Sequence, residues 1–164
     1  MAETYQFTVN GEARSIEADG AMPLIYALRN ELGLTGTRYG CGLEQCGSCM
    51  VLIDGVPGYA CTQGMDAVAG REIQTIESLS AEGGTEAAPH PLQQAFLDEQ
   101  AGQCGYCLSG ILISAKALLD KNPDPSRADI VAALEGHLCR CGAHTRIIKA
   151  IGRAAAVLRG EGAV

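Results

Sequence analysis

Eight cysteines are the residues of this sequence best suited to carry chemistry, and they fall into two groups of four. The first group is Cys41, Cys46, Cys49 and Cys61, with the spacing C-x4-C-x2-C-x11-C. The second group is Cys104, Cys107, Cys139 and Cys141, with the spacing C-x2-C-x31-C-x1-C. Four thiolates are a common ligand set for zinc and for iron–sulfur clusters. We therefore expect one four-cysteine metal site in each half of the chain.

The spacing of the first group is typical of one kind of metal centre. C-x4-C-x2-C with a fourth cysteine further along is the plant-type ferredoxin pattern for a 2Fe–2S cluster. The loop around these cysteines is rich in glycine. Glycine lets backbone N–H groups approach the sulfurs, and such hydrogen bonds help to set the reduction potential of a cluster. Arg38 in the same loop either offsets the negative charge of the cluster or is a solvated arginine.

The spacing of the second group does not by itself distinguish zinc from iron–sulfur. Cys104 and Cys107 are expected to open one helix, and Cys139 and Cys141 to precede another. A helix N-terminus presents free N–H groups and the positive end of the helix dipole, which suits an anionic cluster. Zinc modules favour paired C-x2–4-C knuckles, and the remaining cysteines of neither group form such a pair. We therefore favour iron–sulfur clusters over structural zinc in both halves.

Composition limits the other functions that the chain could have. The net charge of −7 argues against binding to nucleic acid or to anionic membrane surfaces. No apolar run reaches about 18 residues, so no membrane insertion is expected. The N-terminal residues carry no basic segment, apolar core or twin-arginine pair, so we expect a cytoplasmic protein. Its thiols would then be reduced, which favours metal ligands over disulfides.

Three histidines are weaker candidates for metal binding. His90 lies between two prolines and is expected to be exposed to solvent. His137 and His144 flank the last two cysteines, and either could replace a cysteine as in a Rieske centre. Eight cysteines already fill two sites, however, so we expect His144 to pack or to form hydrogen bonds.

The first half of the chain predicts a small α+β unit. Apolar and polar residues alternate over 5–9, Asn10-Gly11 supplies a tight turn, and a returning strand follows over 13–18. A helix is expected from Pro23. Its apolar stripe and its glycine cap are Leu24, Leu28, Leu32 and Gly33. Further strands are expected over 49–54, 56–61 and 71–76, which together predict a mixed, partly antiparallel sheet over the helix.

The second half of the chain predicts a four-helix bundle. The helices are expected over 92–100, 108–120, 127–136 and 143–158, and Ser126 with Asp129 forms a capping-box pattern before the third. The apolar stretch 111–119 is expected either to be bundle core or to face a partner. We therefore predict an α+β protein with one domain over 1–79, a linker over 80–91 that includes Gly83-Gly84, and a helical domain over 92–164.

Three motifs allow a more specific interpretation. They are Tyr39-Gly40-Cys41-Gly42-x3-Cys46-Gly47-x-Cys49, Gln103-Cys104-Gly105-Tyr106-Cys107 and Leu138-Cys139-Arg140-Cys141-Gly142. Together they resemble the small iron–sulfur subunit of the molybdenum hydroxylases, the family of xanthine dehydrogenase and aldehyde oxidoreductase. The resemblance covers nearly the whole chain. Segments 91–96 and 115–120 look most like the nicotinate dehydrogenase and isoquinoline 1-oxidoreductase group.

This resemblance implies a plant-type ferredoxin-like (β-grasp) domain followed by a helical domain, each with one 2Fe–2S cluster on its four cysteines. A separate large subunit would hold a molybdenum–pterin, molybdopterin cytosine dinucleotide, and hydroxylate an N-heteroaromatic compound or an aldehyde. Electrons would pass singly to the second group, then to the first, and then to an FAD subunit or a cytochrome c. Gln103 and Cys141 would contact the pterin, and no residue of this chain would be catalytic.

Two segments depart from the family pattern. Leu108-Ser109-Gly110 stands where many members have Thr-Pro-Gly, and Ala143-His144-Thr145 stands where a Thr-Tyr pair is common. Both lie beside the second cysteine group, so they leave the substrate subclass open. The main alternative function is a free-standing two-cluster ferredoxin that shuttles electrons between soluble partners. A zinc protein that mediates assembly is a further one.

Overall fold

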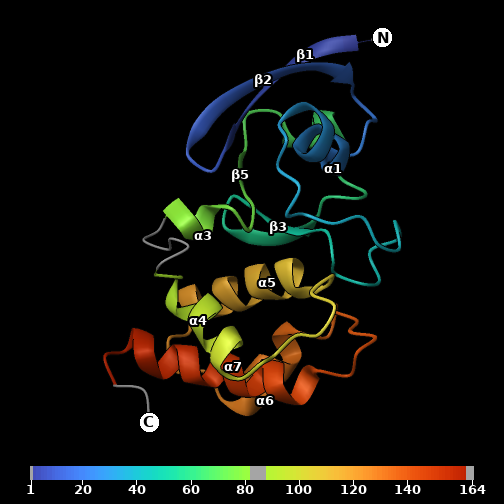
Figure 1. The fold of residues 1–164 in the computed structure, drawn as a ribbon. Coiled ribbons are helices and arrows are strands. Elements are labelled where there is room, and N and C mark those ends of the chain that lie inside the picture. The colour runs from blue at the N-terminus through green and yellow to red at the C-terminus, as the bar shows by residue number, and fades with distance from the viewer. Residues whose placement is uncertain (1, 82–87, 162–164) are drawn as a thin grey trace.

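The computed structural model describes residues 2–81 and 88–161, as a sheet-containing half above a helical half (Figure 1). The glycine pair at 83–84, which we assigned to the linker, lies outside the described residues. No helix within the described ranges has both the length and the apolar character needed to cross a membrane.

The first half contains a five-stranded sheet in the order β2-β1-β5-β3-β4. Its strands are β1 (Ala2–Val9), β2 (Glu12–Asp19), β3 (Met50–Ile53), β4 (Val56–Tyr59) and β5 (Glu72–Gln74). β1 pairs with β5 in parallel, and the other pairs are antiparallel. This pairing confirms the predicted mixed sheet and its two hairpins. They could be predicted because turn residues and alternation are local signals.

The predicted helix over the sheet is also present. It begins as α1 (Leu24–Tyr26) and continues as the π-helical turn η1 (Ala27–Glu31). Leu24 and Leu28 are fully buried, and Gly33 ends the segment with a φ of +69°. Two single-turn helices, α2 (Met65–Val68) and α3 (Ser78–Ala81), were not predicted. Four residues are too few to show a helical periodicity.

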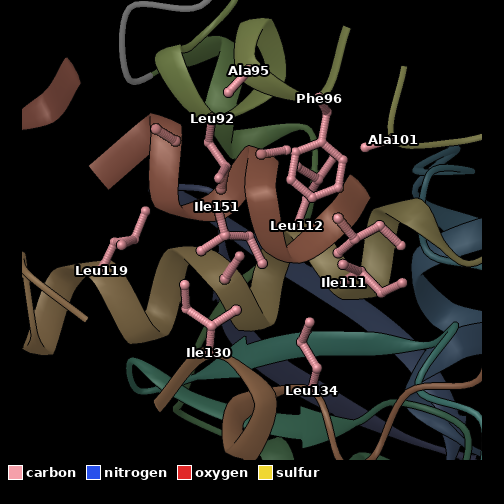
Figure 2. Close-up of a cluster of buried hydrophobic side chains, with 14 of the residues drawn as sticks. Leu92, Ala95, Phe96, Ala101, Ile111, Leu112, Leu119, Ile130, Leu134 and Ile151 are labelled. Atoms are coloured by element: carbon pink, nitrogen blue, oxygen red, sulfur yellow. The ribbon is translucent and has the colours of Figure 1, made fainter. Parts of the chain in front are cut away.

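The second half consists of the four expected helices. They are α4 (Pro91–Asp98), α5 (Leu108–Lys121), α6 (Arg127–Ala133) and α7 (His144–Leu158). The capping box of Ser126 and Asp129 is formed at α6, as predicted. Their buried side chains form one core, in which Leu92, Phe96, Leu112 and Ile151 converge (Figure 2).

The expectation for His90 was wrong. His90 is partly buried and caps α4: its Nδ1 accepts a hydrogen bond of 3.2 Å from the N–H of Leu92. The side chain of Gln93 in turn accepts from the N–H of His90 at 3.2 Å, which completes a capping box. Histidine is not among the preferred N-cap residues, so the sequence did not predict this capping role.

The apolar helix α5 joins the two halves. Ile111 and Leu112 face the helical core, while Ile113 and Ala117 pack with Met50 and Leu52 of the sheet side. Figure 1 shows α5 directly beneath β3, with α4, α6 and α7 on its far side. Both faces of the stretch 111–119 are therefore buried within the chain, which explains why it is mostly apolar.

Two glycines allow a close approach between the halves. Gly110 of α5 lies against the backbone of Gly47 in the first cysteine loop. A Cβ added at Gly110 would stand 1.9 Å from the carbonyl oxygen of Gly47. Such a contact is far inside van der Waals distance, so any larger side chain at position 110 would force the halves apart.

We expect Gly110→Ala to lower the free energy of unfolding by about 1–3 kcal/mol, the usual cost of overpacking. The measurement is denaturant unfolding of the purified protein. Gly152→Ala in α7 is the matched control, because a Cβ there has no neighbour within 4 Å in the described part of the chain. Replacing this glycine in the helix interior with alanine should raise the free energy of unfolding by about 0.5–1 kcal/mol. Equal effects from both substitutions would contradict the close contact.

Candidate metal centres

The first cysteine loop folds so that backbone N–H groups point at sulfur. The N–H groups of Leu43 and Gln45 each donate to Sγ of Cys41 at 3.3 Å. The N–H of Cys41 donates to Sγ of Cys46 at 3.3 Å. Burial by itself would raise the pKa of the Cys41 thiol, but these donors outweigh it and lower the pKa to about 7. The loop thus favours a thiolate at Cys41.

The β3–β4 hairpin explains the long spacing to the fourth cysteine. Cys49 immediately precedes β3, and Cys61 follows β4, so antiparallel pairing returns the chain to its starting point. The N–H of Ala60 donates to the carbonyl of Cys49 at 3.2 Å, which brings the two cysteines side by side. Both are buried, and burial with the neighbouring Cys61 thiol raises the pKa of Cys49 to about 12. Metal binding here would release a proton.

The second group is assembled at two helix starts, as predicted. Cys107 is the N-cap of α5, and the segment with Cys139 and Cys141 leads into α7. Sγ of Cys141 lies 3.5 Å from Sγ of Cys104. Burial, followed by the neighbouring Cys139 thiol, raises the pKa of Cys107 to about 12. For Cys139, hydrogen bonds led by the N–H of Ala143 outweigh burial and lower the pKa.

The donor chemistry of each group fits a 2Fe–2S cluster. Within the described residues, no three or more Cys, His, Asp or Glu side chains converge as they would on a single metal ion. The thiols interact in pairs, and the two pairs of each group also affect each other, since Cys46 acts on Cys49 and Cys104 acts on Cys107. These pairs are Cys41 with Cys46, Cys49 with Cys61, Cys104 with Cys141, and Cys107 with Cys139. A 2Fe–2S cluster takes four thiolates and, when bound, supplies one-electron redox chemistry.

The two cysteine loops touch each other. The N–H of Leu138, next to Cys139, donates to the carbonyl of Cys46 at 3.1 Å. The hydroxyl of Tyr106 donates to the carbonyl of Tyr39. Backbone and side-chain hydrogen bonds therefore join the loop of each group to that of the other, although the groups are far apart in sequence.

Arg38 reaches from the first loop to the second. Its Nη1 donates to the carbonyl of Gly105 at 3.3 Å, and its guanidinium lies 5.3 Å from the ring centroid of Tyr106. The pKa of Cys104 is lowered mainly by the N–H of Tyr106 and the Cys141 thiol, and further by the charge of Arg38. Arg38 is thus neither free in solvent nor placed only against its own loop. Its sequence position could not show this.

Gln103 lies at the surface beside the second group. Its Nε2 donates to the carbonyl of Cys141 at 3.5 Å, so the two residues expected to meet a cofactor are neighbours. Next to Gln103 is a groove of about 1010 Å³, lined in part by Phe96, Leu97 and Arg146. Leu97 is 63% exposed there. Sequence reasoning missed this groove, because its walls come from three separate segments of the helical half.

Two histidines near the second group have other partners. Nε2 of His137 lies 2.7 Å from the hydroxyl of Ser114 in α5. Nε2 of His144 lies 3.4 Å from the carbonyl oxygen of His137, which fits the hydrogen-bonding role that we predicted for His144. Burial, with a smaller effect from His144, lowers the pKa of His137 to about 4, so its ring is neutral near pH 7.

Fold and sites define a two-domain 2Fe–2S protein, and comparison with known families agrees. Residues 7–73 match a 2Fe-2S iron-sulfur cluster binding domain, and residues 75–152 match a [2Fe-2S] binding domain. The chain is 49% identical over 159 residues to a subunit of nicotinate dehydrogenase from Pseudomonas putida, covering 97% of this chain and 99% of the relative. It is 45% identical to the alpha subunit of isoquinoline 1-oxidoreductase from Brevundimonas diminuta, covering 92% and 96%.

Solved structures agree with this likeness. Quinoline 2-oxidoreductase from Pseudomonas putida contains a chain that matches with a TM-score of 0.89 at 37% identity, covering 99% of each chain. Aldehyde oxidoreductase from Desulfovibrio desulfuricans matches with a TM-score of 0.91 at 40% identity, over 97% of this chain but 17% of its own.

The chain therefore belongs to the family of small iron–sulfur subunits of the molybdenum hydroxylases. The predicted α+β fold, a β-grasp ferredoxin-like domain followed by a helical 2Fe–2S domain, is confirmed. The predicted electron-transfer role in an oxidoreductase of the xanthine dehydrogenase family is also confirmed. The same relatives support two 2Fe–2S domains in this chain and a large molybdenum subunit as its partner.

We expect Gly40→Ala to displace the first cluster. A Cβ at Gly40 would lie 2.6 Å from Sγ of Cys46 and 3.3 Å from Oγ of Ser48, so the sulfur must move. Iron analysis with visible spectra should show loss from the first group while the second keeps its iron. Gly152→Ala serves again as control and should keep both. Full iron content in Gly40→Ala would show that the Cys46 sulfur can move without harm.

Proposed function

We propose that the first cysteine group holds one 2Fe–2S cluster and the second group holds the other, as two steps of a single electron relay. The observation that carries this is the contact between the two loops, where the N–H of Leu138 meets the carbonyl of Cys46 at 3.1 Å. Because Leu138 adjoins Cys139, the contact brings a residue of each group within a few bonds of the other. One-electron carriers that must exchange electrons need such proximity.

We further propose the direction of the relay. Electrons enter at the second group from a molybdenum–pterin of the large subunit, molybdopterin cytosine dinucleotide, and leave at the first. The surface positions of Gln103 and Cys104, and the hydrogen bond from Gln103 to Cys141, support entry there. The acceptor beyond the first group is an FAD subunit or a cytochrome c. The exposed Leu43 beside Cys41 supports exit on that side.

The domain limits and the substrate belong to the same proposal. Two main core clusters support one domain over 1–79 and a second over 92–164, joined by the linker 80–91. Leu79, at the end of the first range, packs in the helical core, so the first range already contacts the second there. The substrate is an N-heteroaromatic compound or an aldehyde, held by the large subunit. The names of the relatives, nicotinate dehydrogenase and isoquinoline 1-oxidoreductase, favour the first class.

The decisive experiment is the metal content of the complex isolated through a tag on this chain from its native host. The relay predicts about four irons per chain, with molybdenum and a large co-purifying subunit. About four irons without molybdenum or a partner would instead indicate a free-standing two-cluster ferredoxin. Zinc in place of iron would refute the assignment of both groups.

We expect Cys49→Ser to block electron exit while leaving entry intact. Substrate should still reduce the molybdenum centre and the second cluster, but turnover with the natural acceptor should stop, because the first cluster lacks a ligand. The readouts are rapid-mixing reduction and steady-state rate. The control variant is Thr62→Ser, at the residue after Cys61, and its turnover with the natural acceptor should be normal. Persistent turnover in Cys49→Ser would show that the relay order is wrong.

We expect Gln103→Ala to slow electron entry without removing either cluster, since its side chain bonds the carbonyl of Cys141 and not a sulfur. The rate of reduction of the second cluster by substrate should fall while iron content stays unchanged. Gln94→Ala, exposed on α4, is the matched control. Loss of the second cluster's spectrum would make Gln103 a folding residue instead.

A further inference from the structure

His137 lies where the first cysteine loop, the second cysteine loop and α5 meet. Its side chain is only 4% exposed, and it precedes Cys139 by two residues. The ring packs against Gly47, which stands between Cys46 and Cys49. A Cβ added at Gly47 would lie 2.2 Å from Nδ1 of His137 and 2.7 Å from its Cε1. The imidazole therefore occupies the space that a side chain at position 47 would need.

The far side of the ring is fixed by α5. Nε2 lies 2.7 Å from Oγ of Ser114, whose side chain is also buried at 4% exposure. Nδ1 is buried and has no hydrogen-bond partner among the described residues. A buried ring nitrogen without a partner costs free energy, so packing and not hydrogen bonding determines what that edge faces.

The backbone that follows His137 makes the contact between the loops. Leu138 donates its N–H to the carbonyl of Cys46 at 3.1 Å, and Cys139 comes next. If the His137 ring moved away from Gly47, the adjoining segment 138–139 of the second loop would move with it. The ring and the Leu138 hydrogen bond thus hold the same two segments together, one through packing and the other through the backbone.

We propose that His137 is a positioning residue, whose ring between Gly47 and Ser114 sets the separation of the two clusters. The inference rests on the proposed function, since it requires that both cysteine groups hold clusters. His137 itself gains and loses no electron. Its role follows from distance: the rate of electron tunnelling falls steeply with separation, and the magnetic dipole coupling between two reduced clusters falls with the cube of the separation.

The experiment uses the complex isolated through a tag on this chain, fully reduced with dithionite. EPR measures the dipolar splitting between the clusters, and iron analysis measures their occupancy. His137→Ala should keep its iron but show a reduced splitting and slower electron transfer between the clusters. His137→Gln should restore much of both, because its amide extends about as far as Nε2 and can bond Ser114. His90→Gln, which changes a histidine that caps α4, should match the wild type.

An unchanged splitting and rate in iron-replete His137→Ala would overturn the proposal. If that variant loses iron, Ser114→Ala provides the test of the proposal. It removes only the hydrogen bond to the His137 ring and leaves both loops intact. A reduced splitting in iron-replete Ser114→Ala supports the proposal, and an unchanged splitting overturns it. Wild-type protein without iron would refute the proposed function, and iron analysis reports that outcome separately.

Discussion

The whole structure depends on how an anionic, sulfur-rich centre is housed in a small protein. Thiolates close together repel each other and lose hydration when buried, so donors must replace the water. Backbone N–H groups do this at Cys41 and Cys46, and the start of α7 does it at Cys139. The donors at the Cys41 sulfur belong to residues that carry side chains, Leu43 and Gln45. Glycine is needed at Gly40 for a steric reason, because a Cβ there would lie 2.6 Å from Sγ of Cys46.

Secondary structure brings together cysteines that are distant in sequence. The β3–β4 hairpin returns Cys61 to Cys49, and the helices α5 and α7 place their N-termini at the two halves of the second group. The β3–β4 hairpin is short, α7 is amphipathic and α5 is buried on both faces, so each derives its stability from packing rather than from propensity. The cores of the two halves thus serve mainly to hold four thiols at each site.

The joint between the halves is closely packed. Gly110 lies against Gly47, His137 fills the space beside it, and α5 buries apolar side chains on both sides. Such packing resists small relative movements of the two domains, because protein interiors are dense and have few voids. For a protein that carries electrons between two centres, a rigid joint keeps the distance between them constant.

The sequence by itself determined the chemistry and the local elements. Cysteine spacing indicated the type of metal centre, and turn residues, periodicity and the Ser126 capping box predicted most strands and helices, since these signals act over a few residues. Tertiary structure alone decided which side chains cross between the halves. The contacts of Arg38 with Tyr106 and of His137 with Ser114, and the groove beside Gln103, join segments far apart in sequence. No local pattern encodes such contacts, because they exist only after the two cores have packed together.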